Sequence, residues 1–240
     1  MKKPYLKLYR KIGPYTSWIV DGEWIREHVD IDFTNFAYHY AQKYVPDKQF
    51  WLDVDLGVKE YQFYLDNLIA RYFAVKDDGM DTEEARAVGD KVEKKERSKA
   101  NPHFKDIDSS NIDKKPVGKI GSVRVFVVPG DQVRALDDDY WGGGHDLVYP
   151  YVKPKNSIWL DDSQLPKSYR KLLVHEFYER SIMAFGMSYE DAHYRASIVE
   201  LYCRIYPKVT KTILEYLQSH EKDKDALLRL PKLLRFEKSH

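Results

Sequence analysis

The segment Val20-Asp21-Gly22-Glu23-Trp24-Ile25-Arg26 is matched 108 residues later by Val128-Pro129-Gly130-Asp131-Gln132-Val133-Arg134. At the same offset, Phe50-Trp51-Leu52-Asp53 is matched by Ile158-Trp159-Leu160-Asp161. Self-similarity at a fixed spacing is the sequence signature of a duplicated structural unit, so it decides which fold the chain can adopt.

Further matches extend the similarity toward the C-terminal end of each copy. At an offset of 107, Gly79-Met80 is matched by Gly186-Met187, and Val92-Glu93 by Val199-Glu200. The order is kept over about 80 residues with one residue of slippage, as in a duplicated unit. We therefore predict a tandem internal duplication; the alternative is two similar strand–helix patterns that share a Trp-Leu-Asp triplet by coincidence.

The repeat divides the chain into four expected parts. Residues 1–98 would form a degenerate first repeat, 99–121 a connector, 122–206 the second repeat, and 207–240 a C-terminal helical extension. The connector is rich in Asn, Asp, Ser, Lys, Pro and Gly, which favour loops over packed elements. In the extension we expect Pro231 to interrupt a second short helix.

Each copy gives the same order of expected elements. The second copy predicts, in order, a strand at Ser122–Val128, a short helix after Gly130, a glycine-rich loop at Trp141–His145, an extended stretch near Tyr149–Val152, a strand at Ser157–Asp161, and a long helix from Pro166 to Phe185. Gly186 would end that helix, and Ser188 would cap the next one. The predicted fold class is α+β, with each copy a small β-sheet, a long helix and a following antiparallel helix.

Composition excludes several classes of protein. The net charge of +1 over 240 residues argues against a general nucleic-acid binder. The single cysteine, Cys203, excludes an intramolecular disulfide and a cysteine-rich zinc ribbon. No apolar run approaches the roughly 18–20 residues that span a bilayer, and no signal-peptide core follows the basic N-terminus. We expect a soluble protein in a reducing, cytoplasmic setting, without membrane association.

The long helix of the second copy carries a polar stripe on an apolar background. His175 and Glu179 are four residues apart and share one face, and Glu176 lies next to His175. On the following helix, His193 and Glu200 lie on one face. Because a tight turn joins the two helices, the stripes can face each other and bring His175, Glu179 and His193 together.

Two histidines and one carboxylate suit a Zn²⁺ ion, with Mn or Fe as alternatives. In that arrangement His175, Glu179 and His193 are the expected metal ligands. Glu176 is the expected catalytic residue, placed to take a proton from a metal-bound water.

The stretch from Ile158 to Glu179 resembles the HExx helix of zincin-type metallopeptidases, although the second histidine of HExxH is replaced by Glu179. The resemblance implies a peptidase-type hydrolase in which His175 is a ligand and Glu176 the general base. The second copy is also similar to small bacterial and tailed-phage proteins that share the patterns GGHDLVY, HExxER and GMSYxDAH. We infer no activity from that similarity.

The first copy lacks the chelating residues. At the positions of His175 and Glu176 it has Asn67-Leu68 or Leu68-Ile69, at Glu179 it has Arg71 or Tyr72, and at His193 it has Arg86, depending on where the slip is placed. Glu200 and Arg204, by contrast, are matched by Glu93 and Arg97, so we interpret Glu200 as part of a helix-stabilising pair.

The loop residues Gly143, Gly144, His145 and Asp146 are candidate substrate contacts. Their main-chain N–H groups could bind a substrate carbonyl, and His145 could be an additional ligand or an oxyanion donor. The alternative is a plain glycine-rich turn between strands.

Two functions of different classes follow. The first is a metal-dependent hydrolase of peptidase type that acts on a peptide or protein, with the first repeat as support. The second is a non-enzymatic two-lobed protein that binds a protein or ligand, in which the His/Glu cluster is a structural polar network. The sequence favours no particular oligomeric state.

Overall fold

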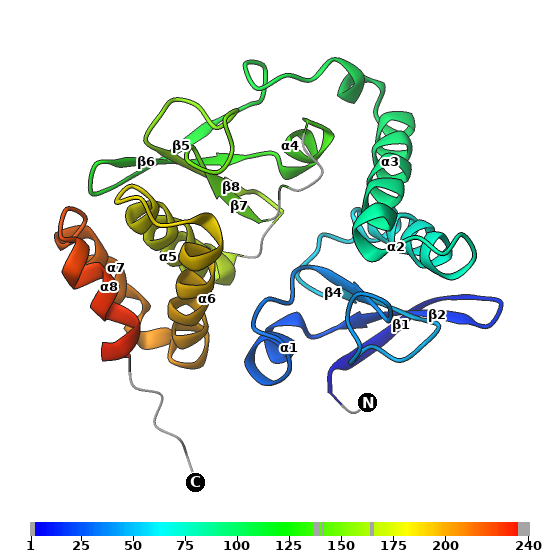
Figure 1. Ribbon diagram of the computed structural model, residues 1–240. Coiled ribbons are helices and arrows are strands. Elements are labelled where there is room, and N and C mark those ends of the chain that lie inside the picture. The colour runs from blue at the N-terminus through cyan, green and yellow to red at the C-terminus, as the bar shows by residue number, and fades with distance from the viewer. Residues whose placement is uncertain (1–2, 137–139, 141, 164–165, 235–240) are drawn as a thin grey trace, which may run out of the picture. The chain divides into compact units, whose positions relative to one another are not determined.

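The computed structural model describes residues 3–136, 140, 142–163 and 166–234 (Figure 1). The chain divides into two compact units, Met1–Asp108 with Asp131–Asp139, and Ser109–Gly130 with Tyr140–His240. Each unit holds a four-stranded sheet followed by a helix pair. The predicted α+β tandem duplication is therefore confirmed.

The sheet of the first unit has the order β1-β2-β4-β3. Strands β1 and β2 are antiparallel, β2 and β4 are parallel, and β3 is antiparallel to β4. The elements of the first repeat are β1 (Tyr5–Ile12), β2 (Tyr15–Val20), α1 (Gly22–His28), β3 (Phe36–Tyr38), β4 (Gln49–Asp53), α2 (Tyr61–Lys76) and α3 (Thr82–Ala100).

The second sheet repeats this topology with the order β5-β6-β8-β7. Its elements are β5 (Lys115–Ile120), β6 (Val123–Val128), β7 (Gly143–His145), β8 (Ser157–Asp161), α5 (Pro166–Met183) and α6 (Tyr189–Ile205), followed by α7 (Thr210–Ser219) and α8 (Lys224–Leu233). Strand β5 lies inside the expected connector 99–121, after a short 3₁₀ helix at Pro102–Asp106. Most of helix α4 (Gly130–Leu136) belongs to the first unit.

The two repeated sequence motifs meet in space. In the first unit the N–H of Gly22 donates to Asp53 Oδ1 at 3.2 Å, and a Cβ atom at Gly22 would lie only 1.9 Å from the Asp53 carboxylate. In the second unit a Cβ atom at Gly130 would lie 2.1 Å from the carboxylate of Asp161. The glycine of one motif is therefore required by the aspartate of the other, which explains why both recur together.

The α5–α6 pair has the expected caps, although α5 ends at Met183 rather than at Phe185. Gly186 has φ +88° and, with Met187, donates to the carbonyls of Met183 and Ile182, which closes α5 with a left-handed glycine. The Ser188 side chain accepts from the N–H of Asp191 at the start of α6. The short turn between these caps returns α6 along α5, and it is this return that places the two polar stripes side by side.

The glycine-rich stretch differs from the prediction. Gly143–His145 forms the buried strand β7, which pairs antiparallel with β8, whereas residues 149–152 form turns rather than an extended stretch. A Cβ atom at Gly144 would lie 2.5 Å from the ring of Tyr149, so the missing side chain lets the strand enter a crowded layer. Tertiary packing therefore overrides the low strand propensity of glycine. Trp141 lies outside the described residues.

Helices α7 and α8 complete the core of the second unit, and α8 continues through Pro231 rather than stopping there. A proline at this position leaves the carbonyl of Leu227 without its helical N–H donor. The hydroxyl of Tyr178 on α5 donates to that carbonyl at 2.9 Å. The α5 side chain thus supplies the hydrogen bond that Pro231 cannot make.

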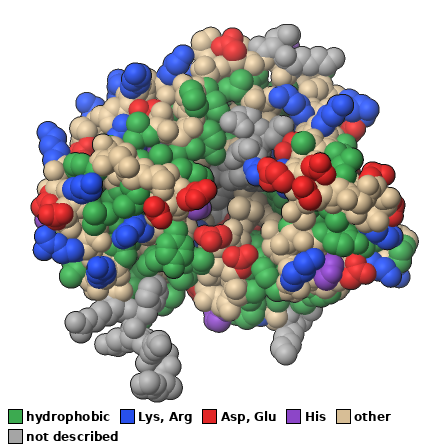
Figure 2. All heavy atoms as spheres, in the orientation of Figure 1, with side chains coloured by type: hydrophobic (Ala, Val, Ile, Leu, Met, Phe, Trp, Pro, Cys, Tyr) green, Lys and Arg blue, Asp and Glu red, His purple; other side chains and the backbone are tan. Residues whose placement is uncertain are grey.

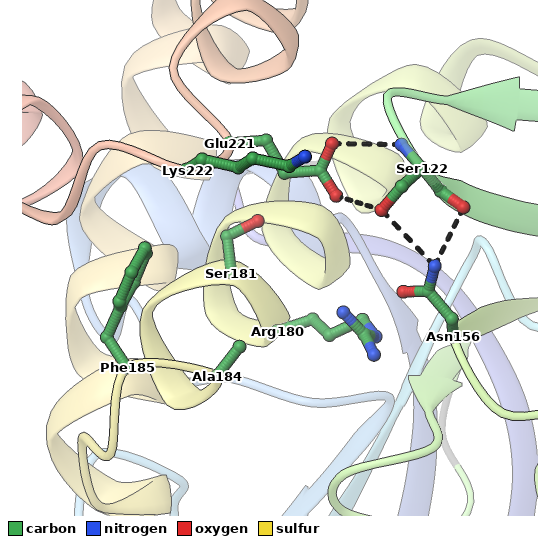
Figure 3. A pocket seen from close by; sticks show the side chains of 8 residues that line it. All are labelled: Ser122, Asn156, Arg180, Ser181, Ala184, Phe185, Glu221 and Lys222. Atoms are coloured by element: carbon green, nitrogen blue, oxygen red, sulfur yellow. Dashed lines mark hydrogen bonds between the residues drawn. The ribbon is translucent and has the colours of Figure 1, made fainter.

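A polar contact joins the α7–α8 turn to the β5–β6 hairpin (Figure 3). The Glu221 carboxylate accepts from the N–H of Ser122 at 2.9 Å and from its hydroxyl, and the amide of Asn156 donates to the Ser122 carbonyl at 2.8 Å. These residues and Arg180 line a pocket of about 270 Å³. The contact fixes the C-terminal extension to the sheet.

No helix in the described part of the chain is long and apolar enough to cross a membrane. On the face drawn in Figure 2, lysine and arginine side chains are interspersed with acidic ones.

We expect Tyr178→Phe to destabilise the protein by about 1–2 kcal/mol, because it leaves the buried Leu227 carbonyl without a donor. In a Pro231→Ala background the new N–H can reach that carbonyl, so the loss should shrink by about 1 kcal/mol. Urea unfolding of the four proteins in this double-mutant cycle measures the difference. Equal losses in the two backgrounds would contradict the proposed compensation.

Candidate metal centre

Helices α5 and α6 bring the three expected ligands together. His193 Nδ1 lies 2.8 Å from Glu179 Oε2, and His175 Nε2 lies 3.3 Å from the same oxygen. The two histidine nitrogens are 3.2 Å apart. These three donor atoms therefore form a compact triangle at the junction of the two helices.

The triangle has the dimensions of one face of a coordination shell. For metal–ligand bonds of about 2.05 Å, neighbouring donors in a tetrahedral site lie about 3.3 Å apart. The observed separations of 2.8, 3.2 and 3.3 Å are close to that spacing. One cation could therefore contact all three atoms with little rearrangement.

A carboxylate of helix α6 lies beside the His175 ring. Its Nδ1 lies 2.9 Å from Glu200 Oε2, and Arg204 bonds the same glutamate. A proton on Nδ1 leaves Nε2 as the lone-pair nitrogen, which faces His193 and Glu179. Glu200 does form the expected helix pair with Arg204, and it also contacts the candidate ligand. The spacing of seven residues from His193 to Glu200 was the sequence signal for this second role.

Glu176 is the fourth side chain of the cluster and is buried. A Cβ atom at Gly143 would lie 3.0 Å from Glu176 Oε1, so strand β7 leaves just enough space for this carboxylate. Within the described residues no hydrogen bond or ion pair takes up its oxygens. Burial raises the pKa of Glu176 to about 8, and the Glu179 charge adds to the effect.

Contacts within the cluster shift the pKa values of Glu179 and His175 in opposite directions. Burial raises the pKa of Glu179, but hydrogen bonds with His145, His175 and His193 outweigh it and hold the pKa well below its usual range. Burial lowers the pKa of His175, but its contacts with Glu179 and Glu200 outweigh that and raise the pKa well above its usual range. Close carboxylates in a buried site favour a compensating cation.

Solvent reaches the cluster at His193. Its side chain is 39% exposed, whereas those of His175 and Glu179 are 8% and 4% exposed. The ring of Tyr189 lies 5.4 Å from the His193 ring. An ion or a small molecule can therefore approach along the α6 side.

The candidate substrate-loop residues do not form an open loop. Gly143, Gly144 and His145 are buried in β7, and His145 Nε2 lies 3.0 Å from Glu179 Oε1. The Asp146 carboxylate accepts from Arg180 at 2.7 Å and from the N–H of Asn156 at 2.8 Å. The loop expected to contact substrate is therefore a buried strand that packs against the Glu179 side chain.

The structure also settles the alignment of the first repeat. Asn67 donates to Glu93 at 2.7 Å, just as His175 contacts Glu200, so Asn67 is the counterpart of His175. Leu68 and Arg71 then correspond to Glu176 and Glu179. Sheet register pairs Tyr38 with Phe50 and His145 with Ile158, which makes Tyr38 the counterpart of His145.

In the first repeat the position equivalent to Glu179 carries a positive charge, that of Arg71. Arg71 bonds Asp90, and the intrahelical pair of Arg97 with Glu93 is kept. The position of the Glu179 carboxylate is thus taken by a guanidinium, and no ligand set remains among the equivalent residues. The described part of the chain contains two groups suited to a metal ion, and both lie in the second unit: His175, Glu179 and His193, and His145, Glu176 and Glu179.

Comparison with known proteins found no matching family model, no curated relative and no similar solved structure.

We expect Glu200→Gln to weaken Zn²⁺ binding by about 10–100-fold, because the partner that orients a ligating histidine is weakened. Glu93→Gln is the matched control, since Glu93 occupies the same place in the first repeat without a ligand set. Isothermal titration of both variants with Zn²⁺ makes the comparison. An equal effect of the two substitutions would show that Glu200 acts only through helix stability.

Proposed function

We propose that the chain is a metal-dependent hydrolase with a single ion held by His175, Glu179 and His193. The observation that carries the proposal is the triangle of donor atoms with the Glu176 carboxylate one residue from a ligand. A purely structural polar network does not explain why the buried Glu176 carboxylate has no hydrogen bond or ion pair within the described residues.

A bound divalent cation would lower the pKa of a coordinated water and polarise a carbonyl. Glu176 lies on the face of α5 toward strand β7, where it can accept the proton as the water oxygen attacks the carbonyl carbon. The same carboxyl then returns the proton to the departing nitrogen as the amide C–N bond breaks. A cation would also lower the pKa of Glu176 and favour its basic form.

Zinc is the ion that we propose, with Mn or Fe as alternatives, because two imidazoles and one carboxylate suit each of them. The resemblance to zincin-type metallopeptidases supports a peptide or protein as substrate. The departure at Glu179 leaves a carboxylate ligand in place of an imidazole, which keeps three protein ligands and open positions for water and substrate. Cys203 is a free, buried thiol, in keeping with a cytoplasmic site of action.

A second candidate function is a non-enzymatic binding protein in which the cluster is a structural network. The observation in its favour is that the Glu179 carboxylate has three imidazole partners at 2.8–3.3 Å. Buried polar groups that satisfy one another can order a core. This reading requires no metal and no role for Glu176.

Replacement of Glu176 by Gln separates the two functions. We expect the variant to bind one equivalent of Zn²⁺ like the wild type and to lose about 10²–10⁴-fold in hydrolysis of an internally quenched random peptide library. The charge of Glu176 is removed while its shape is kept, so the fold and the ligands stay in place.

The control is Asp66→Asn, the same carboxylate-to-amide change on helix α2 of the first repeat, where the Asp66 side chain accepts a hydrogen bond from Gln62; it should leave both readouts unchanged. Undiminished hydrolysis by Glu176→Gln would reject Glu176 as the base. Absence of Zn²⁺ binding by the wild type would reject the metal centre and favour the binding protein.

A further inference from the structure

The structure assigns His145 as a positioning residue that holds Glu179, rather than as a metal ligand. This inference rests on the proposed metal centre and adds a residue to it. It also decides between the two overlapping groups of side chains that could hold an ion, since His145, Glu176 and Glu179 form the second of them.

The contacts of the His145 ring determine which of its nitrogens carries the proton. The backbone N–H of Leu147 donates to His145 Nδ1 at 3.3 Å, so Nδ1 carries the lone pair. In a neutral imidazole the proton must then reside on Nε2. Nε2 faces Glu179 Oε1 at 3.0 Å and can donate to it, but a protonated nitrogen has no lone pair for a cation.

The His145 ring has little freedom to rotate. His145 is completely buried at the end of β7, where its backbone pairs with Ile158 of β8. Asp146, the next residue, is fixed by Arg180 and by two backbone N–H groups of the β8 side. A ring held on both sides keeps its direction when an ion enters the neighbouring triangle.

The contact with His145 limits how Glu179 can bind an ion. With Oε1 engaged by His145, the carboxylate has only Oε2 directed to His175 and His193. Glu179 then binds an ion through one oxygen, which leaves coordination positions for water and substrate. A carboxylate without this donor could rotate and bind through both oxygens.

The first repeat supports the coupling of these two positions. Where Glu179 is replaced by Arg71, His145 is replaced by Tyr38. The imidazole donor and the carboxylate that receives it are therefore present together or absent together, while the neighbouring Glu–Arg pair is kept in both units.

Two variants of His145 test the assignment through Co²⁺, which reports its ligands by visible absorption. His145→Gln keeps an N–H donor toward Glu179, whereas His145→Phe removes it. We expect wild type and both variants to bind one equivalent of Co²⁺. Affinity should be close to wild type for His145→Gln and about 10–100-fold weaker for His145→Phe, with Co²⁺ bands of the same ligand set.

A second measurement reads the position of the proton on His145 directly in the wild type. Long-range ¹H–¹⁵N correlation in the Zn²⁺-loaded protein should show His145 with its proton on Nε2, the signal being assigned by its absence from His145→Gln. A ligand role for His145 requires Nε2 without a proton.

Several results would overturn the assignment. Two equivalents of Co²⁺ in the wild type, falling to one in both variants, would show a second ion at His145. Equal loss of affinity in both variants with changed Co²⁺ bands would show a ligand. Wild-type affinity in His145→Phe would show that the ring only fills space. If the wild type binds no metal, the proposed function itself is rejected. If the wild type binds Co²⁺ and both His145 variants bind it equally tightly, only the role of His145 is rejected.

Discussion

The Glu179 carboxylate lies in a buried site and contacts three imidazoles, one from a strand and two from helices. Such a carboxylate keeps its charge only when donors surround it, and donors with limited reach must come from elements fixed close by. Strand β7 supplies one side of this environment, and helices α5 and α6 supply the other. The ionised Glu179 side chain thus depends on three local features that position its donors: the glycines of β7, the left-handed turn at Gly186 and the cap at Ser188.

The duplication provides a comparison within one molecule. Both repeats keep the glycine–aspartate contact at the end of the central strands, the helix caps, and the Glu–Arg pair on the last helix. They differ at the five positions that define the cluster. In one repeat an arginine side chain supplies the positive charge, and in the other the side chains present carboxylates and imidazoles to the same space. The fold is compatible with either solution, so the site is a property of a few side chains on a shared scaffold.

Much of the fold could be predicted because it follows from local sequence patterns. The repeated motifs predicted two similar units, and helical spacing placed His175, Glu179 and His193 on facing stripes. The strand at Gly143–His145 could not be predicted, since glycine has low strand propensity and its place depends on the bulk of Tyr149 and Glu176 around it. Continuation of α8 through Pro231 depends on a hydroxyl 53 residues earlier in the chain. The contact of His145 with Glu179 likewise joins segments that no local pattern relates.

We propose that one cation binds where three donor atoms from two helices converge. Elemental analysis of untagged protein, purified without chelator and then equilibrated with Zn²⁺, tests it most directly beside a His175→Ala/His193→Ala double variant. We expect about one equivalent of metal in the wild type and none retained by the double variant, with both proteins folded. No metal in either protein, or equal metal in both, would contradict it.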